Sequence, residues 1–149
     1  FINIAHINRS RRYKFGCGYG PVGLTIAKLI PAATIYMSDI NERAVELARK
    51  NAALNGINNV IIKTGNGFLP FPNQSFDLIA TNPPVRAGKQ VLYGLIEEAW
   101  RAVRIGGWIV AVILTRQGAK SLARKIAEVF GNVSEREKGG GYRVIAGQR

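Results

Sequence analysis

Apolar and polar positions along the chain follow two alternating periods. Short, largely apolar runs predict buried strands, and between them apolar residues recur at steps of three and four, as on one face of a helix. The runs that predict strands are residues 34–38, 60–64, 76–81, 108–114 and 142–146. The helical pattern covers residues 22–30, 41–55, 92–103 and 119–130. This alternation, with short connections, predicts an α/β domain with a mainly parallel sheet.

The segments that lie just after the expected strands are polar or rich in glycine. They are residues 16–20, 39, 65–67 and 82–88. Open α/β sheets bind ligands outside the carboxyl ends of their strands. These segments are therefore the places where a binding site is expected.

Composition is that of an ordinary folded domain. The chain has 149 residues, of which 47% are hydrophobic and 20% charged, and these values exclude disorder and collagen-like repeats. The longest apolar run, 108–114, is too short to span a bilayer, and no secretion signal is visible, so we expect no membrane association. The single cysteine, Cys17, indicates a reducing compartment, hence the cytoplasm. With His6 as the only histidine, no zinc site and no bound metal are expected.

Net charge changes this picture. The chain carries 21 Lys and Arg against nine Asp and Glu, a formal charge of +12. So basic a domain commonly meets a polyanion, and phosphate contacts to nucleic acid are expected, with ordinary solubility as the alternative. The excess is spread along the chain, at positions that include Arg9, Arg11, Arg12, Arg86, Lys89, Lys120, Arg124 and Lys125.

A glycine turn opens the first helical segment. Gly16, Gly18 and Gly20 form a G-x-G-x-G pattern, and Gly18, Gly20 and Gly23 form G-x-G-x-x-G. Glycines there allow a ligand to approach the backbone closely, and the second pattern is the dinucleotide fingerprint. A purely structural tight turn is the alternative.

Asp39 ends the expected strand that follows this turn. Its carboxylate can accept hydrogen bonds from both hydroxyls of a ribose. It can equally cap the next helix. Because Asn41 is available as the cap, we favour the ribose role for Asp39.

Asn82-Pro83-Pro84 directly follows the expected strand 76–81. The prolines fix the backbone, and Pro83 keeps Asn82 out of the helical region. The amide oxygen of Asn82 and nearby carbonyls can then converge on one point, which suits an exocyclic amine with its two N–H donors. An ordinary strand-ending turn is the alternative, because Asn-Pro is common in turns.

Four motifs, in this order and spacing, resemble the class I S-adenosylmethionine-dependent methyltransferases: GCGYGPVG (16–23), SDI (38–40), FDLIATNPP (76–84) and VRIGGWIVAV (103–112). Asn-Pro-Pro resembles the branch that methylates exocyclic or amide nitrogens. NPPVRAGK, FGNV and GGGYRVI are most similar to the C-type small-subunit ribosomal RNA guanine methyltransferases and their small methyltransferase domain. The resemblance covers residues 15–149 and leaves 1–14 as an atypical amino-terminal segment. It implies a Rossmann-like fold with a twisted, mainly parallel sheet, helices on both faces and an antiparallel last strand.

The resemblance also implies roles for individual residues. Asp39 would bind the ribose hydroxyls of S-adenosylmethionine, Ile40 would lie against its adenine, and Asn66 would contact the adenine amine. The full set of implied cofactor contacts is Gly16, Cys17, Gly18, Gly20, Asp39, Ile40, Asn66, Gly67 and Asn82. The implied catalytic residues, which hold the target amine, are Asn82, Pro83 and Pro84. Arg86 and Lys89 lie directly after the Asn-Pro-Pro turn, so their position, rather than the resemblance, predicts contacts to the RNA backbone, with Val85 beside them; a solvated loop with two ordinary cations is the alternative.

Lys14 departs from the family pattern. The family has an acid in this slot, which binds the ammonium group of the cofactor and which a lysine would repel. The run 11–15 that contains Lys14 is also too polar for a buried parallel strand, and Arg11 and Arg12 would be costly inside one. An altered or truncated amino terminus, a substitute acid, or lost cofactor affinity would each explain it, and we favour the first.

Two further positions depart more mildly. Asn66 replaces an acid, although its amide oxygen still accepts a hydrogen bond. Val85 replaces an aromatic residue that stacks on the target base, a contact worth roughly 1–3 kcal/mol. Aromatic residues that could compensate are Tyr19, Phe68 and Tyr142.

Several functions are compatible with these motifs. The leading hypothesis is methyl transfer from S-adenosylmethionine to a guanine amine of ribosomal RNA. A catalytically impaired RNA-binding module, an NAD-dependent oxidoreductase and a methyltransferase of protein amides are the alternatives. The motifs indicate neither the target nucleotide nor the oligomeric state.

Overall fold

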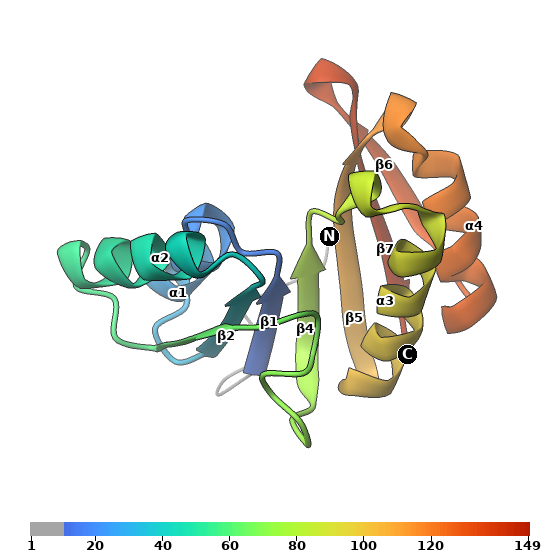
Figure 1. Cartoon of the computed structure of the whole chain (residues 1–149). Helices are drawn as coiled ribbons and strands as arrows, with labels where there is room; N and C mark the ends of the chain where they lie inside the picture. Colours follow the sequence, from blue (N-terminus) through green and yellow to red (C-terminus); the bar gives the residue numbers. More distant parts are fainter. Residues whose placement is uncertain (1–10) are drawn as a thin grey trace. The chain divides into compact units, whose positions relative to one another are not determined.

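The computed structural model describes residues 11–149, which divide into two compact units at Phe76. The first unit is Phe1–Phe76. Its described elements are β1 (Arg11–Phe15), α1 (Pro21–Leu29), β2 (Thr34–Asp39), α2 (Glu42–Leu54) and β3 (Val60–Thr64). The second unit, Asp77–Arg149, holds β4 (Phe76–Thr81) apart from its first residue, and then α3 (Lys89–Ala102), β5 (Val103–Leu114), α4 (Ala119–Phe130), β6 (Ser134–Lys138) and β7 (Tyr142–Gln148). Short 3-10 turns are η2 (Val85–Ala87), η3 (Thr115–Gln117) and η4 (Gly139–Gly141). Figure 1 shows the elements in chain order.

The strands of the first unit are parallel, in the order β3-β2-β1. Helices α1 and α2 pack on β2 and β3 and bury an apolar cluster in which Met37 and Ala48 are fully inaccessible. Asn41 caps α2 by accepting a hydrogen bond from the backbone N–H of Arg43 at 3.0 Å. The parallel strands and helices expected from the periodicity are therefore present here.

Strand β1 contains the two arginines that the sequence made doubtful. Arg11 lies opposite Thr34 of β2, is exposed, and donates to the side-chain oxygen of Gln74 at 2.9 Å. Arg12 is buried, with 2% of its surface accessible. Both residues lie inside the strand rather than before it. Residues 1–10, which include His6, Arg9 and most of the segment 1–14, are outside the described residues.

The second unit has the strand order β4-β5-β7-β6, in which β7 runs antiparallel to both β5 and β6. The antiparallel last strand is thus confirmed. β6 was not predicted, because its sequence SEREK lacks an apolar face and it pairs only at the sheet edge. β5 also begins before the expected strand, at Val103, and continues through Gly106 and Gly107. Helices α3 and α4 pack together, and α4 lies on β7.

No helix among the described residues is both long and apolar enough to cross a membrane.

Two helical glycines are expected to respond oppositely to alanine. A Cβ at Gly23 of α1 would lie 2.6 Å from Sδ of the buried Met37, so Gly23→Ala should lower the free energy of unfolding by about 1–3 kcal/mol. A Cβ at Gly94 of α3 would meet nothing within 4 Å, so Gly94→Ala should raise it by about 0.5–1 kcal/mol. Urea denaturation followed by circular dichroism measures both. Equal effects would contradict the close approach of α1 to β2.

Candidate functional site

The glycine turn between β1 and α1 is anchored to the end of β2. Gly16, Gly18 and Gly20 all have left-handed backbone angles, with φ of 62°, 55° and 98°, which side chains other than glycine rarely adopt. The N–H of Gly18 donates to Oδ2 of Asp39 at 2.8 Å. The N–H of Cys17 donates to the carbonyl of Ser38 at 2.9 Å. The turn and the acidic strand end are therefore one connected structure.

Asp39 is not the cap of α2, because Asn41 takes that position. Oδ1 of Asp39 accepts from the N–H of Asn41 at 3.0 Å, and Oδ2 accepts from Gly18. A carboxylate offers about four acceptor positions, so one on each oxygen is left over. Asp39 is half-buried, and these two acceptors match the two hydroxyls of a ribose.

The turn after β3 lies beside the same strand end. The N–H of Gly65 donates to the carbonyl of Asp39 at 2.9 Å, and the hydroxyl of Ser38 donates to the carbonyl of Gly67 at 3.1 Å. Asn66 between them is exposed. Ile40 is also exposed, with 73% of its surface accessible, and a flat apolar group such as an adenine would cover it. The structure thus brings the predicted cofactor residues of the first unit together.

The surroundings of a Cβ added at each glycine show where the turn leaves space for a ligand. A Cβ at Gly18 would meet nothing within 4 Å, whereas one at Gly20 would lie 2.8 Å from Cδ1 of Leu24. Cys17 is buried, with 4% of its surface accessible, and belongs to the apolar core of the unit. Gly18 therefore leaves open space for a ligand, Gly20 is required for packing, and Cys17 offers only its backbone.

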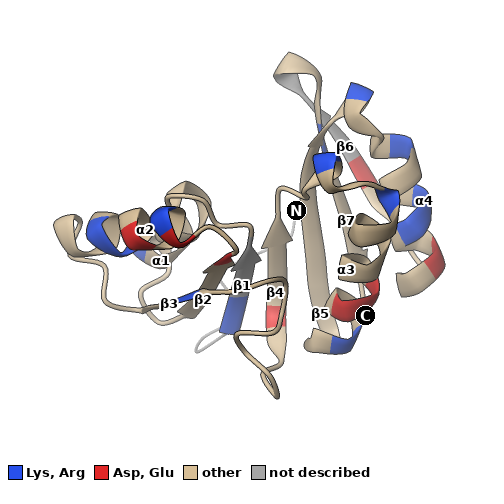
Figure 2. Cartoon of the chain, viewed as in Figure 1, with Lys and Arg blue, Asp and Glu red and all other residues tan. Residues whose placement is uncertain are grey.

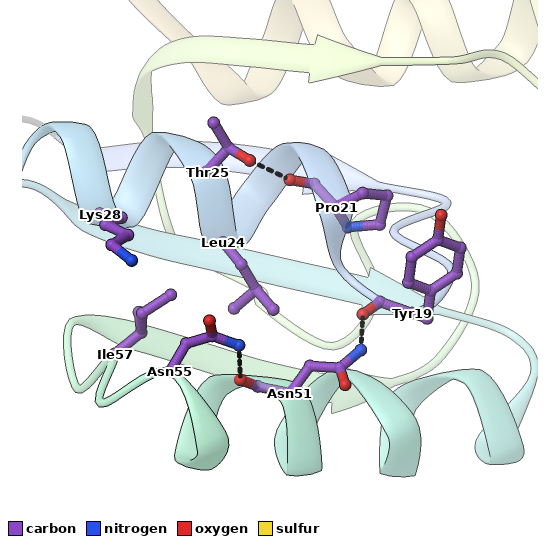
Figure 3. A pocket seen from close by; sticks show the side chains of 8 residues that line it. All are labelled: Tyr19, Pro21, Leu24, Thr25, Lys28, Asn51, Asn55 and Ile57. Atoms are coloured by element: carbon purple, nitrogen blue, oxygen red, sulfur yellow. Dashed lines mark hydrogen bonds between the residues drawn. The ribbon is translucent and has the colours of Figure 1, made fainter.

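A pocket of about 230 Å³ lies between α1 and α2, behind the glycine turn (Figure 3). Its lining residues are Tyr19, Pro21, Leu24, Thr25, Lys28, Asn51, Asn55 and Ile57. Asn51 donates from Nδ2 to the carbonyl of Tyr19 at 2.9 Å, so α2 holds the turn from this side. Asn51 was not predicted, and its one sequence signal is an asparagine in the middle of a helix, where this residue is unfavourable.

The Asn-Pro-Pro turn follows β4 in the second unit. Asn82 is exposed, and its side chain makes no hydrogen bond to any described residue. Pro83 is buried, and its carbonyl accepts from the N–H of Val85 at 2.8 Å, which starts η2. The carbonyl of Pro84 accepts from the N–H of Ala87 at 2.9 Å. The two proline rings and these two backbone hydrogen bonds constrain the turn, and the Asn82 amide is free to bind a ligand.

The residues expected to meet the RNA continue from this turn. Arg86 and Lys89 are exposed and form no ion pair with a described residue, and Val85 is half-buried. Among the aromatic candidates, Tyr19 and Tyr142 are exposed. Phe68 instead packs against Phe76, with ring centroids 6.4 Å apart, so it serves the core.

Lys14 lies opposite Met37 in the pairing of β1 with β2, and its side chain is outside the described part of the structure. Lys14 is thus the next-to-last residue of β1, and its assignment to the acidic slot rests on the resemblance alone. Within residues 11–149, no group of three or more His, Cys, Asp or Glu side chains is placed so that it could hold a metal ion.

The fold is that of the class I methyltransferases. The chain superposes on the T. thermophilus 16S rRNA N2 G1207 methyltransferase RsmC, solved with AdoMet and guanosine, with a TM-score of 0.81 and 20% identity, covering 96% of this chain and 38% of that one. The sequence profile of the methyltransferase small domain matches residues 3–146, and the chain belongs to this family. The predicted Rossmann-like methyltransferase fold and the family resemblance are confirmed.

Three relatives show how far the similarity extends. YbxB of Bacillus subtilis is 43% identical over 135 residues, covering 90% of this chain and 67% of YbxB. A release factor glutamine methyltransferase of Xylella fastidiosa is 34% identical over 79 residues, covering 53% of this chain and 29% of that enzyme. The ribosomal RNA small subunit methyltransferase C of Pseudomonas entomophila is 31% identical over 142 residues, covering 91% of this chain and 40% of that enzyme. The chain therefore spans less than half of the two named enzymes.

Proposed function

We propose that the chain transfers a methyl group from S-adenosylmethionine to an exocyclic amine of a guanine in ribosomal RNA. The observation that carries this proposal is the free, exposed amide of Asn82, held after β4 by two prolines in a methyltransferase fold. The relation to ribosomal RNA small subunit methyltransferase C supports the choice of substrate. With this substrate, the proposal includes a cytoplasmic location for the reaction.

Residues of the first unit would hold the cofactor. Asp39 keeps two acceptors for the ribose hydroxyls while it anchors Gly18 and Asn41. Gly16 and Gly18 would let the methionine part approach the backbone, whereas Gly20, also a predicted contact, shapes the turn by its packing against Leu24. Cys17 would contribute its backbone only, and Ile40, Asn66 and Gly67 would receive the adenine. When bound, S-adenosylmethionine supplies an electrophilic methyl group on a sulfonium.

Residues of the second unit would hold the target amine. One N–H of the guanine amine donates to Oδ1 of Asn82, and the other donates to the carbonyl of Pro83, which keeps one acceptor position beside its bond from Val85. Both bonds would fix the direction in which the nitrogen lone pair points. Transfer would form a C–N bond as the C–S bond of the sulfonium breaks, and the methylated amine would then lose a proton to water. Positioning, more than acid–base catalysis, drives such a displacement.

The base must leave its stack to enter this site, because the amine of a paired guanine is not accessible to Asn82. A net charge of +12 favours a polyanionic substrate over a protein. Methylation of a protein amide is the second candidate, favoured by the release factor glutamine methyltransferase relative. The family match supports methyl transfer over the NAD-dependent oxidoreductase hypothesis.

The test is transfer of a tritiated methyl group from S-adenosylmethionine to acceptors assayed in parallel. The acceptors are small-subunit and large-subunit ribosomal RNA transcribed in vitro and a bacterial peptide release factor. Label in small-subunit RNA, recovered as N2-methylguanosine after digestion, supports the proposal. Label in the release factor alone makes the chain a protein methyltransferase, and RNA binding without transfer makes it a binding module. Thermal stabilisation by NAD but not by S-adenosylmethionine would restore the oxidoreductase hypothesis.

Lys14→Asp is expected to tighten S-adenosylmethionine binding. The substitution replaces a cation near the cofactor's ammonium group by an anion, and a gain of about 1.4 kcal/mol corresponds to about tenfold in affinity. Isothermal titration calorimetry measures it, with Lys28→Asp on exposed α1 as the control for overall charge. Weaker binding by Lys14→Asp would show that Lys14 does not occupy the acidic slot.

A further inference from the structure

Exposed cations gather at one end of the second unit. They lie in η2, at the start of α3, in η3 and in the first turns of α4. Figure 2 colours the Lys and Arg positions along these elements blue. The residues are Arg86, Lys89, Arg116, Lys120 and Arg124, called here the basic end. Each is exposed, and none forms an ion pair or hydrogen bond with a described residue.

Lys125, next to this set in the sequence, has a different environment. Its Nζ lies 2.7 Å from Oε1 of Glu97 and 3.3 Å from Oε1 of Glu128, and 5.5 Å from the ring centroid of Tyr93. The hydrogen bond between Lys125 and Glu97 lowers the pKa of the Glu97 carboxyl and raises the pKa of the Lys125 ammonium. Glu97 and Glu128 thus compensate Lys125 in the middle of α4, whereas no ion pair with a described acid compensates the cations of the basic end.

The cations of the basic end do not help the fold. Lys89 is the first residue of α3 and Lys120 the second of α4, where the helix dipole disfavours positive charge. Lys120 and Arg124 are also one turn apart on α4, and like charges at this spacing repel. Neither helix has an acid in its first turn or a side-chain cap. Charges that oppose folding are explained by a partner that carries the opposite charge.

We propose that the basic end binds the phosphate backbone of the substrate RNA on the side of the target nucleotide that leads toward α4. This inference rests on the proposed RNA substrate. The Asn-Pro-Pro turn runs directly into η2 and α3, so a nucleotide held at Asn82 brings its nearest phosphates to Arg86 and Lys89. Lys120 and Arg124 are about 6 Å apart along the axis of α4, a spacing similar to that of neighbouring phosphates on one strand. They extend the contact to further nucleotides.

The test removes three charges at once from α4 and η3. The variant Arg116→Gln, Lys120→Gln and Arg124→Gln is compared with a matched triple variant of the first unit, Lys28→Gln, Arg43→Gln and Lys50→Gln, which removes three exposed cations elsewhere. Binding of a fluorescein-labelled single-stranded fragment of small-subunit ribosomal RNA to the full chain is followed by anisotropy over a range of salt concentrations. Each phosphate contact contributes about 0.7 to the slope of log K against log salt for single strands.

The basic-end variant should bind the RNA roughly tenfold or more weakly at 0.1 M salt and lose about 2 from the slope. The control should change affinity by less than about threefold and keep the slope. Melting temperature should stay the same or rise in the basic-end variant, because repulsive charges are removed. Equal losses in the two variants would overturn the basic end as an RNA surface. If the wild-type chain methylates RNA and the two variants lose affinity equally, only the basic end as an RNA surface is refuted. If the wild-type chain methylates only the release factor, the RNA substrate itself is refuted.

Discussion

Replacing Asn82 by alanine is expected to lower the rate of methyl transfer by about 100-fold or more, since loss of positioning of this size is typical when a reacting group is no longer held. Asn82 is exposed and makes no hydrogen bond to a described residue, so its amide serves no structural purpose that the change would disturb. Pro83 and Pro84 keep the backbone of the turn in place. Single-turnover rates with saturating S-adenosylmethionine and RNA measure the effect on the chemical step.

Two further variants show whether the acceptor oxygen is the group that matters. Asn82→Asp retains an acceptor, so it should keep more activity than Asn82→Ala. Gln90→Ala removes an exposed amide of α3 nearby in the sequence and should leave the rate unchanged. Asn82 is also among the predicted cofactor contacts, and calorimetry separates the two roles. If the affinity for S-adenosylmethionine fell as steeply as the rate, Asn82 would be a cofactor-binding residue. The target amine would then need another hydrogen-bond acceptor.

Elements with strong periodicity could be predicted from the sequence, and weakly patterned ones could not. Helices α3 and α4 bury the apolar positions that recur at steps of three and four, among them Leu92, Ile96 and Ile126. Strand β6 escaped prediction, because an edge strand with the sequence SEREK needs no apolar face. β1 was doubted because a buried strand is normally apolar, yet it forms with Arg12 buried within it.

The candidate site shows a similar division. The positions of Gly18 and Asp39 at strand ends follow from the alternation of elements, and so does their closeness. The bond between the Gly18 N–H and Asp39, the support of the turn by Asn51, and the pairing of Lys125 but not Lys120 or Arg124 depend on side-chain directions. Such directions are set by tertiary packing, which spacing along the chain does not encode.

The largest effect on cofactor affinity is expected from Asp39→Ala. The substitution removes both acceptors proposed for the ribose hydroxyls, and hydrogen bonds to a charged group contribute about 1.5–3 kcal/mol each, so the affinity for S-adenosylmethionine should fall by about 100-fold or more. It also leaves the N–H groups of Gly18 and Asn41 without their acceptor. The glycine turn then keeps only the bond from Cys17 to the Ser38 carbonyl as its anchor to β2, and the free energy of unfolding should fall by about 1–3 kcal/mol.

The variant Asn41→Ala distinguishes the two effects expected of Asp39→Ala, which are a loss of stability and a loss of contact with the ligand. This variant removes the cap of α2, which costs about 0.5–2 kcal/mol of stability, but it leaves the carboxylate in place. Asn41→Ala should therefore unfold more easily and still bind S-adenosylmethionine with nearly wild-type affinity. Asp39→Asn, which keeps one acceptor oxygen of two, should fall between wild type and Asp39→Ala. If Asn41→Ala and Asp39→Ala weakened binding equally, the carboxylate would act only through the stability of the turn, and the ribose would need another partner.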